Sequence, residues 1–293
     1  MNPPERVESV TLPDGRRLAY VCHGDKGGIP LLLCHGTPGS RRCITTAMAE
    51  QASQQGFRLI IPDRPGYGLS DPHPGSGLLD WPRDVDHLLA GLDIPHAHLL
   101  GYSLGGMHAL ACAWALPYRF KSLTLVESLA PNLLDDSLAN IMSPTVRNIL
   151  MLASSQPLEF RTAMTALTED VDQTLDLMLS SYSLQDQATG TDPAIRAAHR
   201  TAIQDTVSRG EGALVEDYLN SVASWGFSLT DIALPTRIWQ GLEDINTPPA
   251  LAEYLAAQLP NAQLTRLSGE GHLAFYSSWK AICAGIKTIA EPG

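Results

Sequence analysis

The sequence contains no long apolar run, and this limits the kinds of protein it can encode. Its apolar stretches are far shorter than the roughly 18–20 residues that a membrane-spanning helix needs. Residues 1–20 also lack the basic start and apolar core of a secretory signal peptide. We therefore expect a cytoplasmic protein without a membrane partner.

Basic residues are also scarce. The chain has 20 Lys and Arg against 31 Asp and Glu, which gives a net charge of −11. Nucleic-acid binding requires a basic surface that contacts phosphates, and no basic stripe is present. The charge therefore argues against a nucleic-acid partner.

Cysteines are few, and their spacing does not suggest pairs. There are five, an odd number, and no two of them form a C-x-x-C motif. This spacing predicts reduced thiols in the core, with neither a disulfide framework nor a bound metal. The five are Cys22, Cys34, Cys43, Cys112 and Cys283.

The chain has enough apolar residues for a large core, since 44% of its 293 residues are apolar. In residues 1–130 and 229–293, short apolar runs alternate with helical patterns, which predicts an α/β fold with a mostly parallel sheet covered on both faces. The predicted strands are 7–12, 17–22, 30–34, 58–61, 98–100, 122–126, 236–239 and 262–267, the first two forming a hairpin. The predicted helices are 42–55, 80–91, 106–116, 249–259 and 277–288.

Residues 131–228 interrupt this alternation. They contain no convincing strand pattern and several helical ones, which predicts a helical lid inserted between two core strands. Such a lid would select the substrate. The helical stretches are 143–153, 158–167, 170–180, 192–204 and 211–223.

A G-x-S-x-G motif at residues 101–105 follows the predicted strand 98–100 and precedes the helix 106–116. A strand that turns directly into a helix strains the backbone of the central serine, and small neighbours make this tolerable. The turn leaves the hydroxyl of Ser103 exposed above the sheet edge. Ser103 is therefore the predicted nucleophile, and a serine nucleophile needs a base, an orienting acid and donors for an oxyanion.

The predicted base is His272, which lies in a glycine-bearing loop after the last strand. That loop can place an imidazole over a serine at the end of another strand. His108 lies on the helix after Ser103 and points away from its hydroxyl. Apart from His35, which follows the strand 30–34, the remaining histidines lie in hairpin, loop or lid contexts: His23, His73, His87, His96, His98 and His199.

The predicted acid is Asp244, just beyond the strand 236–239 and hence at the same edge of the sheet. A turn-forming aspartate before Pro248 is the structural alternative. Glu243 is adjacent and would serve after a shift of one residue. Glu127 ends the strand that follows the elbow and would reach the same imidazole from the other side.

The predicted oxyanion donors are two backbone N–H groups. One belongs to Leu104, the residue after the nucleophile. The other belongs to Thr37, in the loop after the strand 30–34, where Gly36 allows the backbone to approach the substrate closely. His35 is expected to hold this supporting loop by hydrogen bonds and to take no part in proton transfer.

Together these segments resemble the α/β-hydrolase fold family over essentially the whole chain. The order Ser103, Asp244, His272 matches the family's order of nucleophile, acid and base. Residues 35–40 (HGTPGS) and 63–70 (DRPGYGLS) match other family segments, in which Asp63 and Arg64 are read as structural. The resemblance implies an eight-stranded, mostly parallel sheet with helices on both faces, a helical cap and no cofactor.

The resemblance also narrows the chemistry. Members of the fold that displace halide or open epoxides carry an aspartate nucleophile, so Ser103 favours acyl transfer. Proline iminopeptidases usually have a tryptophan after the elbow serine and lid acids that hold a free amine. Here the following residue is Leu104, and the acids of the lid show no diagnostic arrangement: Asp135, Asp136, Glu169 and Asp170.

The sequence therefore predicts a carboxylesterase-like serine hydrolase acting on an ester of a small molecule, with thioester and lactone substrates as variants. A C–C hydrolase, lyase or cyclase that uses the same triad is the main alternative. A proline iminopeptidase and a binding or sensor protein that has lost turnover are less favoured. Four lid methionines either line an acyl pocket or pack within the lid: Met142, Met151, Met164 and Met178.

Overall fold

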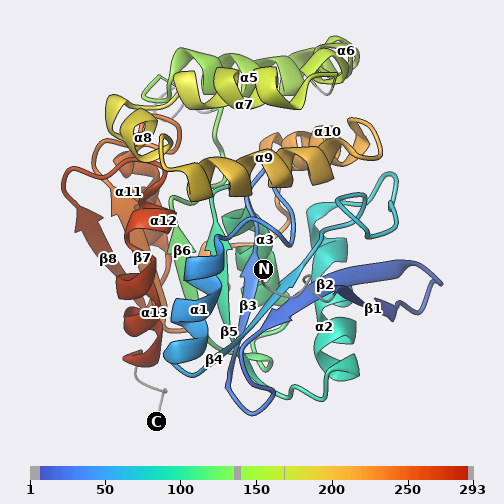
Figure 1. Cartoon of the computed structure of the whole chain (residues 1–293), viewed down its shortest axis with the longest axis vertical. Coiled ribbons are helices and arrows are strands. Elements are labelled where there is room, and N and C mark those ends of the chain that lie inside the picture. Colours follow the sequence, from blue (N-terminus) through green and yellow to red (C-terminus); the bar gives the residue numbers. More distant parts are fainter. Residues whose placement is uncertain (1–6, 135–139, 168, 290–293) are drawn as a thin grey trace.

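An eight-stranded sheet forms the centre of the computed structural model, which describes residues 7–134, 140–167 and 169–289 (Figure 1). The strand order is β1-β2-β4-β3-β5-β6-β7-β8. β2 pairs antiparallel with β1 and β4, and every other neighbouring pair is parallel, which confirms the predicted sheet. The strands are β1 (Val7–Thr11), β2 (Arg17–His23), β3 (Ile29–Cys34), β4 (Phe57–Pro62), β5 (Ala97–Tyr102), β6 (Phe120–Val126), β7 (Thr236–Gly241) and β8 (Ala262–Leu267).

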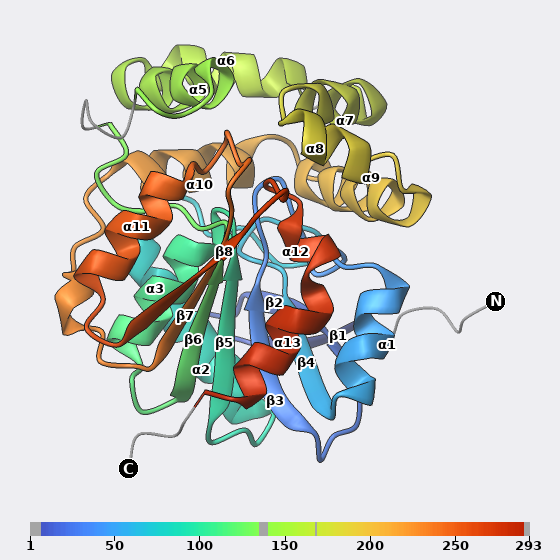
Figure 2. The same ribbon diagram turned by 90° about the vertical axis from the view of Figure 1, so that its left-hand side faces the viewer.

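Helices cover both faces of the sheet (Figure 2). Because successive side chains of a strand point to opposite faces, Leu31 and Leu33 of β3 enter one apolar layer and Leu32 and Cys34 the other. Burial on both faces explains why these strands read as continuous apolar runs. One face carries α1 (Thr46–Gln54), α12 (Ala274–Ser277) and α13 (Trp279–Lys287), and the other carries α2 (Trp81–Gly91), α3 (Gly105–Ala115) and α11 (Pro249–Gln258). Short 3-10 turns span Leu78–Asp80 and Leu229–Asp231.

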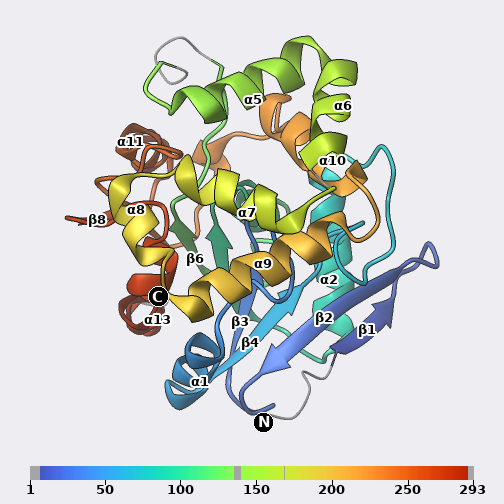
Figure 3. The same cartoon turned by 45° about the horizontal axis from the view of Figure 1, so that its top comes forward.

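A layer of helices lies above the sheet, between β6 and β7 in the chain, where the sequence predicts the insertion (Figures 1 and 3). We call α5 to α10 the upper layer. Within the described residues it contains no strand, and none of the chain's described helices is long and apolar enough to cross a membrane. Its members are α5 (Pro144–Ser155), α6 (Pro157–Leu167), α7 (Val171–Ser180), α8 (Leu184–Thr189), α9 (Pro193–Val207) and α10 (Gly212–Val222).

The structure departs from the predicted helices at a few places. α1 begins at Thr46 rather than at Arg42, because the hydroxyl of Thr45 caps it by accepting the N–H of Met48 at 3.2 Å. The preceding residues stay in a loop whose Cys43 carbonyl accepts the Tyr276 hydroxyl. The short helices α8 and α12 were not predicted, since one turn or so carries too little periodicity to be recognised.

Candidate active site

Ser103 stands at the sharp turn between β5 and α3, as predicted. Its φ of 54° lies in the left-handed region, and its N–H donates to the Val126 carbonyl of β6 at 2.9 Å. The turn also brings the chain against β3, where a Cβ at Gly105 would lie 2.2 Å from the Cys34 carbonyl oxygen. Only glycine fits this close approach, which explains the small residue after the elbow.

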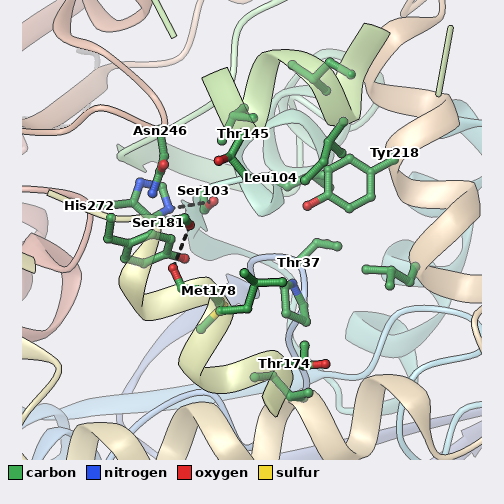
Figure 4. Close-up of a pocket in the computed structure, with 18 of the residues that line it drawn as sticks. Thr37, Ser103, Leu104, Thr145, Thr174, Met178, Ser181, Tyr218, Asn246 and His272 are labelled. Carbon is green, nitrogen blue, oxygen red and sulfur yellow. Dashed lines mark hydrogen bonds between the residues drawn. The ribbon is translucent and has the colours of Figure 1, made fainter. Parts of the chain in front are cut away.

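The structure brings the three predicted triad residues together. His272 Nε2 lies 3.0 Å from Ser103 Oγ (Figure 4). Its Nδ1 lies 2.8 Å from Asp244 Oδ2. The imidazole and the carboxylate are almost completely buried, while Ser103 is half-buried beside a cavity. A hydroxyl bonded to an imidazole that is itself bonded to a carboxylate can pass its proton to the imidazole.

Two backbone N–H groups face the same cavity without another partner. In the described part of the chain, neither the N–H of Thr37 nor that of Leu104 donates a hydrogen bond, and both residues line the cavity with Ser103. Buried N–H groups normally have partners, so these two are available to a bound oxyanion. Gly36 lets the loop lie here, because a Cβ there would already be 3.3 Å from that of Ser103.

The loop that carries Thr37 is held by polar contacts. His35 Nε2 accepts the backbone N–H of Arg64, and its Nδ1 donates to the carbonyl of the next residue, Gly36, at 2.8 Å. Burial lowers the pKa of His35 well below its usual value, so the ring stays neutral. The Arg64 guanidinium donates to the carbonyls of His35 and Gly36. His35 and Arg64 therefore lie where the sequence expects them, with no contact to Ser103.

A cavity of about 170 Å³ opens in front of Ser103, roofed by the upper layer (Figure 4). Of the predicted methionines, Met164 and Met178 line it, whereas Met151 is exposed and Met142 packs in the core. Apart from His272, no charged or basic side chain is among the described residues that line it. Its largely apolar wall includes the aliphatic Leu150, Ile203 and Leu214 and the aromatic ring of Tyr218.

The sequence model of the α/β hydrolase fold matches residues 29–278, most of the chain. The chain belongs to the α/β-hydrolase family. It is 26% identical to a proline iminopeptidase of Lactiplantibacillus plantarum over 276 residues, which cover 89% of this chain and 92% of that protein. It is 27% identical to a 2-hydroxy-6-oxononadienedioate/2-hydroxy-6-oxononatrienedioate hydrolase of Cupriavidus pinatubonensis, over 93% of this chain and 91% of the relative.

A solved structure also shows the α/β-hydrolase fold. The enol-lactonase from Burkholderia xenovorans superimposes on this chain with a TM-score of 0.73 at 19% identity. The match covers 96% of this chain and 99% of that enzyme. The architecture is therefore shared over most of the chain, while residue roles rest on the site itself.

Among the described contacts, neither rival acid forms a hydrogen bond with the imidazole of this α/β hydrolase. Glu243 is exposed. Glu127 is fully buried, accepts the Gly241 N–H at 2.9 Å and contacts the Asp244 carboxyl group. Burial and the neighbouring Asp244 charge raise the pKa of Glu127 well above its usual range, so the protonated, neutral form of Glu127 is favoured beside Asp244.

Several residues of the site were not predicted. Thr247 donates its hydroxyl to Asp244 Oδ2 at 2.7 Å and lies 3.1 Å from His272 Nδ1. Its N–H and that of Asn246 donate to Asp244 Oδ1. An aspartate in a loop often accepts the backbone N–H groups two and three residues later, and this local turn signal was available in the sequence.

Of the lid acids considered earlier, Asp135 and Asp136 lie outside the described residues.

The charges around His272 set an expected pH dependence. Burial disfavours the charged imidazole, but the carboxylates of Asp244 and Asp186 outweigh it and raise the pKa of His272 above 6.5. His199, whose ring contacts Tyr276, stays neutral, because burial and the charge of His272 lower its pKa to about 4. Only a neutral His272 accepts the Ser103 proton, so kcat/KM is expected to fall with decreasing pH, with a midpoint above 6.5. A pH profile of ester hydrolysis measures it, and a midpoint well below that value would contradict it.

Proposed function

We propose that this α/β hydrolase is a serine esterase that cleaves carboxylic esters with an uncharged, aliphatic acyl chain. The observation that carries the proposal is the 3.0 Å contact of His272 with Ser103 Oγ, beside the unpaired N–H groups of Thr37 and Leu104. Thioesters and lactones present the same carbonyl chemistry and are variants of it. The upper layer, within residues 131–228, acts as the lid that encloses the acyl chain.

The mechanism follows from these contacts. His272 removes the proton of Ser103 as its oxygen attacks the ester carbonyl, and Asp244 keeps the ring in the tautomer that presents Nε2 to the serine. The N–H groups of Thr37 and Leu104 stabilise the oxyanion, each contributing about 3 kcal/mol. His272 then protonates the leaving alcohol. In the second half of the reaction His272 takes a proton from water as the water attacks the acyl-enzyme carbonyl, and it returns that proton to Ser103 as the bond between the acyl group and the serine breaks.

The uncharged cavity argues against two relatives' substrates. A peptidase that holds a free amine needs an acidic partner, and the dioate named for the Cupriavidus hydrolase needs cations. The described lining offers neither a carboxylate nor a basic side chain other than His272. Burying an unpaired charge in such a wall is costly, so both kinds of substrate are disfavoured.

The size of the cavity predicts a preferred chain length. A cavity of about 150 Å³ holds benzene, so the 170 Å³ here suits an acyl chain of about six carbons. Among p-nitrophenyl acetate, butyrate, hexanoate and laurate, kcat/KM is expected to peak at butyrate or hexanoate. Met178→Trp fills the cavity and is expected to lower hexanoate turnover about tenfold while sparing acetate.

Met151→Trp is the matched control, because Met151 is exposed on α5 and does not line the cavity. Its chain-length profile is expected to equal that of the wild type. Absence of turnover with every ester would overturn the proposal and favour the C–C bond chemistry known from relatives. Equal effects of the two tryptophan substitutions would overturn the assignment of the acyl pocket.

A further inference from the structure

Two buried aspartates of the upper layer point away from the cavity, into the loops that carry the candidate catalytic groups. Asp186 of α8 is 1% exposed and Asp217 of α10 is 5% exposed. Neither residue lines the cavity. A buried carboxylate is costly unless its oxygens are fully bonded, so what each oxygen contacts reveals its role.

Asp186 holds the loop of the predicted base. Its Oδ2 accepts the N–H of His272 at 2.9 Å, and its Oδ1 accepts the N–H of Leu273 at 2.6 Å. The approach depends on Gly271, where a Cβ would lie 2.2 Å from Asp186 Oδ2. Ser183, which caps α8, donates its hydroxyl to the same Oδ2. Each carboxylate oxygen therefore accepts one backbone N–H, and these two N–H groups belong to His272 and to the residue after it.

Asp217 holds the loop of the predicted oxyanion donor. Its Oδ2 accepts the Thr37 hydroxyl at 2.6 Å, the Arg64 guanidinium at 2.6 Å and the Tyr67 hydroxyl at 2.5 Å. Its Oδ1 lies 3.1 Å from His108 Nε2. Burial opposes the charge, but Arg64 outweighs it and lowers the pKa of Asp217 below its usual range.

We propose that Asp186 and Asp217 are positioning residues through which the upper layer sets the geometry of the base and of the oxyanion hole. Asp186 fixes the imidazole through its backbone, and Asp217 fixes the Thr37 N–H through the side chain of the same residue. The inference rests on the proposed function, which assigns the base to one of these loops and an oxyanion donor to the other. It adds that the lid positions these groups as well as covering the cavity.

The chemistry of the contacts explains why carboxylates are required. Asparagine at position 186 keeps one acceptor oxygen and turns an NH₂ group toward the other backbone N–H, so one of the two bonds is lost. Asparagine at position 217 leaves the buried Arg64 guanidinium without a negative partner. Because both aspartates belong to the layer that covers the cavity, displacement of that layer releases both loops.

The test compares Asp186→Asn and Asp217→Asn with the wild type. The matched control is Asp176→Asn on α7, since Asp176 is exposed and pairs with Arg196 within the same layer. Three quantities are measured: kcat and KM with p-nitrophenyl butyrate, the rate of Ser103 labelling by a fluorophosphonate, and backbone hydrogen exchange. Thr37→Val serves as a second variant if Asp217→Asn does not fold, because it removes only the hydroxyl that joins the loop to Asp217.

Each variant is expected to lower kcat and the labelling rate by about 10–100-fold, with KM changed less than about threefold, because misplaced catalytic groups slow the chemical step. Asp186→Asn is expected to speed exchange in residues 271–275 and not in residues 35–39. Asp217→Asn and Thr37→Val are expected to show the opposite pattern. The control is expected to match the wild type throughout.

Unchanged kcat and labelling in the folded variants would overturn the inference, as would faster exchange spread evenly over the chain. Failure of the proposed function looks different, because the wild type itself would then neither hydrolyse an ester nor label at Ser103. In that event the local exchange patterns alone decide whether the two aspartates hold these loops.

Discussion

Ser103→Ala is expected to lower kcat for p-nitrophenyl butyrate by about 10⁵–10⁶-fold, the loss seen when a triad nucleophile is removed. His272 and the N–H groups of Thr37 and Leu104 then have no attacking oxygen to serve. The variant is also expected to lose all labelling by a fluorophosphonate. Its thermal unfolding is expected to stay close to that of the wild type, because the half-buried hydroxyl bonds His272 alone among the residues that the structure describes.

Ser180→Ala is the matched control for this experiment. Ser180 is exposed at the end of α7, and its hydroxyl, which is the group the substitution removes, donates to the Leu177 carbonyl of the same helix. Its kcat and labelling are expected to equal those of the wild type. Ester hydrolysis that persists in Ser103→Ala would show that another group performs the reaction and would remove the acyl-enzyme mechanism.

Asp244→Asn is expected to lower kcat by about 10⁴-fold, because an amide stabilises the wrong tautomer of His272 and no longer balances the imidazolium. Glu127→Gln is expected to retain kcat within about tenfold. A glutamine amide is uncharged, as the protonated Glu127 is, and its oxygen still accepts the Gly241 N–H. Steady-state kinetics of the two variants, with circular dichroism to verify folding, measures the difference.

This pair of variants separates two carboxyl groups that lie in contact. If Glu127→Gln lost as much activity as Asp244→Asn, the orienting acid would be shared between them. If Asp244→Asn kept near-normal activity, Glu127 would be the acid instead. The structure favours Asp244, since it alone of the two bonds His272 among the described contacts.

Much of the site was predictable because its groups follow strand ends. Ser103 follows β5, Asp244 follows β7 and His272 follows β8, and the carboxyl ends of parallel strands meet at one edge of the sheet. Local pattern therefore suffices to place each residue at the same edge. Thr37, three residues beyond the end of β3, is found by the same reasoning.

The choice between rival groups was not predictable in this way. Glu127 and Asp244 both follow strands at the same edge, so only side-chain direction and burial distinguish them. The methionines of the upper layer show the same limit. Met164 and Met178 face the cavity while Met151 faces solvent, and the face of each helix is decided by its packing against other helices.

The amino-acid pattern alone determined the sheet, its helical cover, the helical segment between β6 and β7, and the placing of Ser103, Asp244 and His272 after β5, β7 and β8. These depend on periodicity and on motifs that span a few residues. The roles of Asp186 and Asp217 appeared only in the folded chain. Asp186 lies 86 residues from His272, and Asp217 lies 180 residues from Thr37, so nothing local connects them. At most Ser183 and Asp186 read as a helix cap, and only the packing of the upper layer on the sheet edge aims that carboxylate at the base.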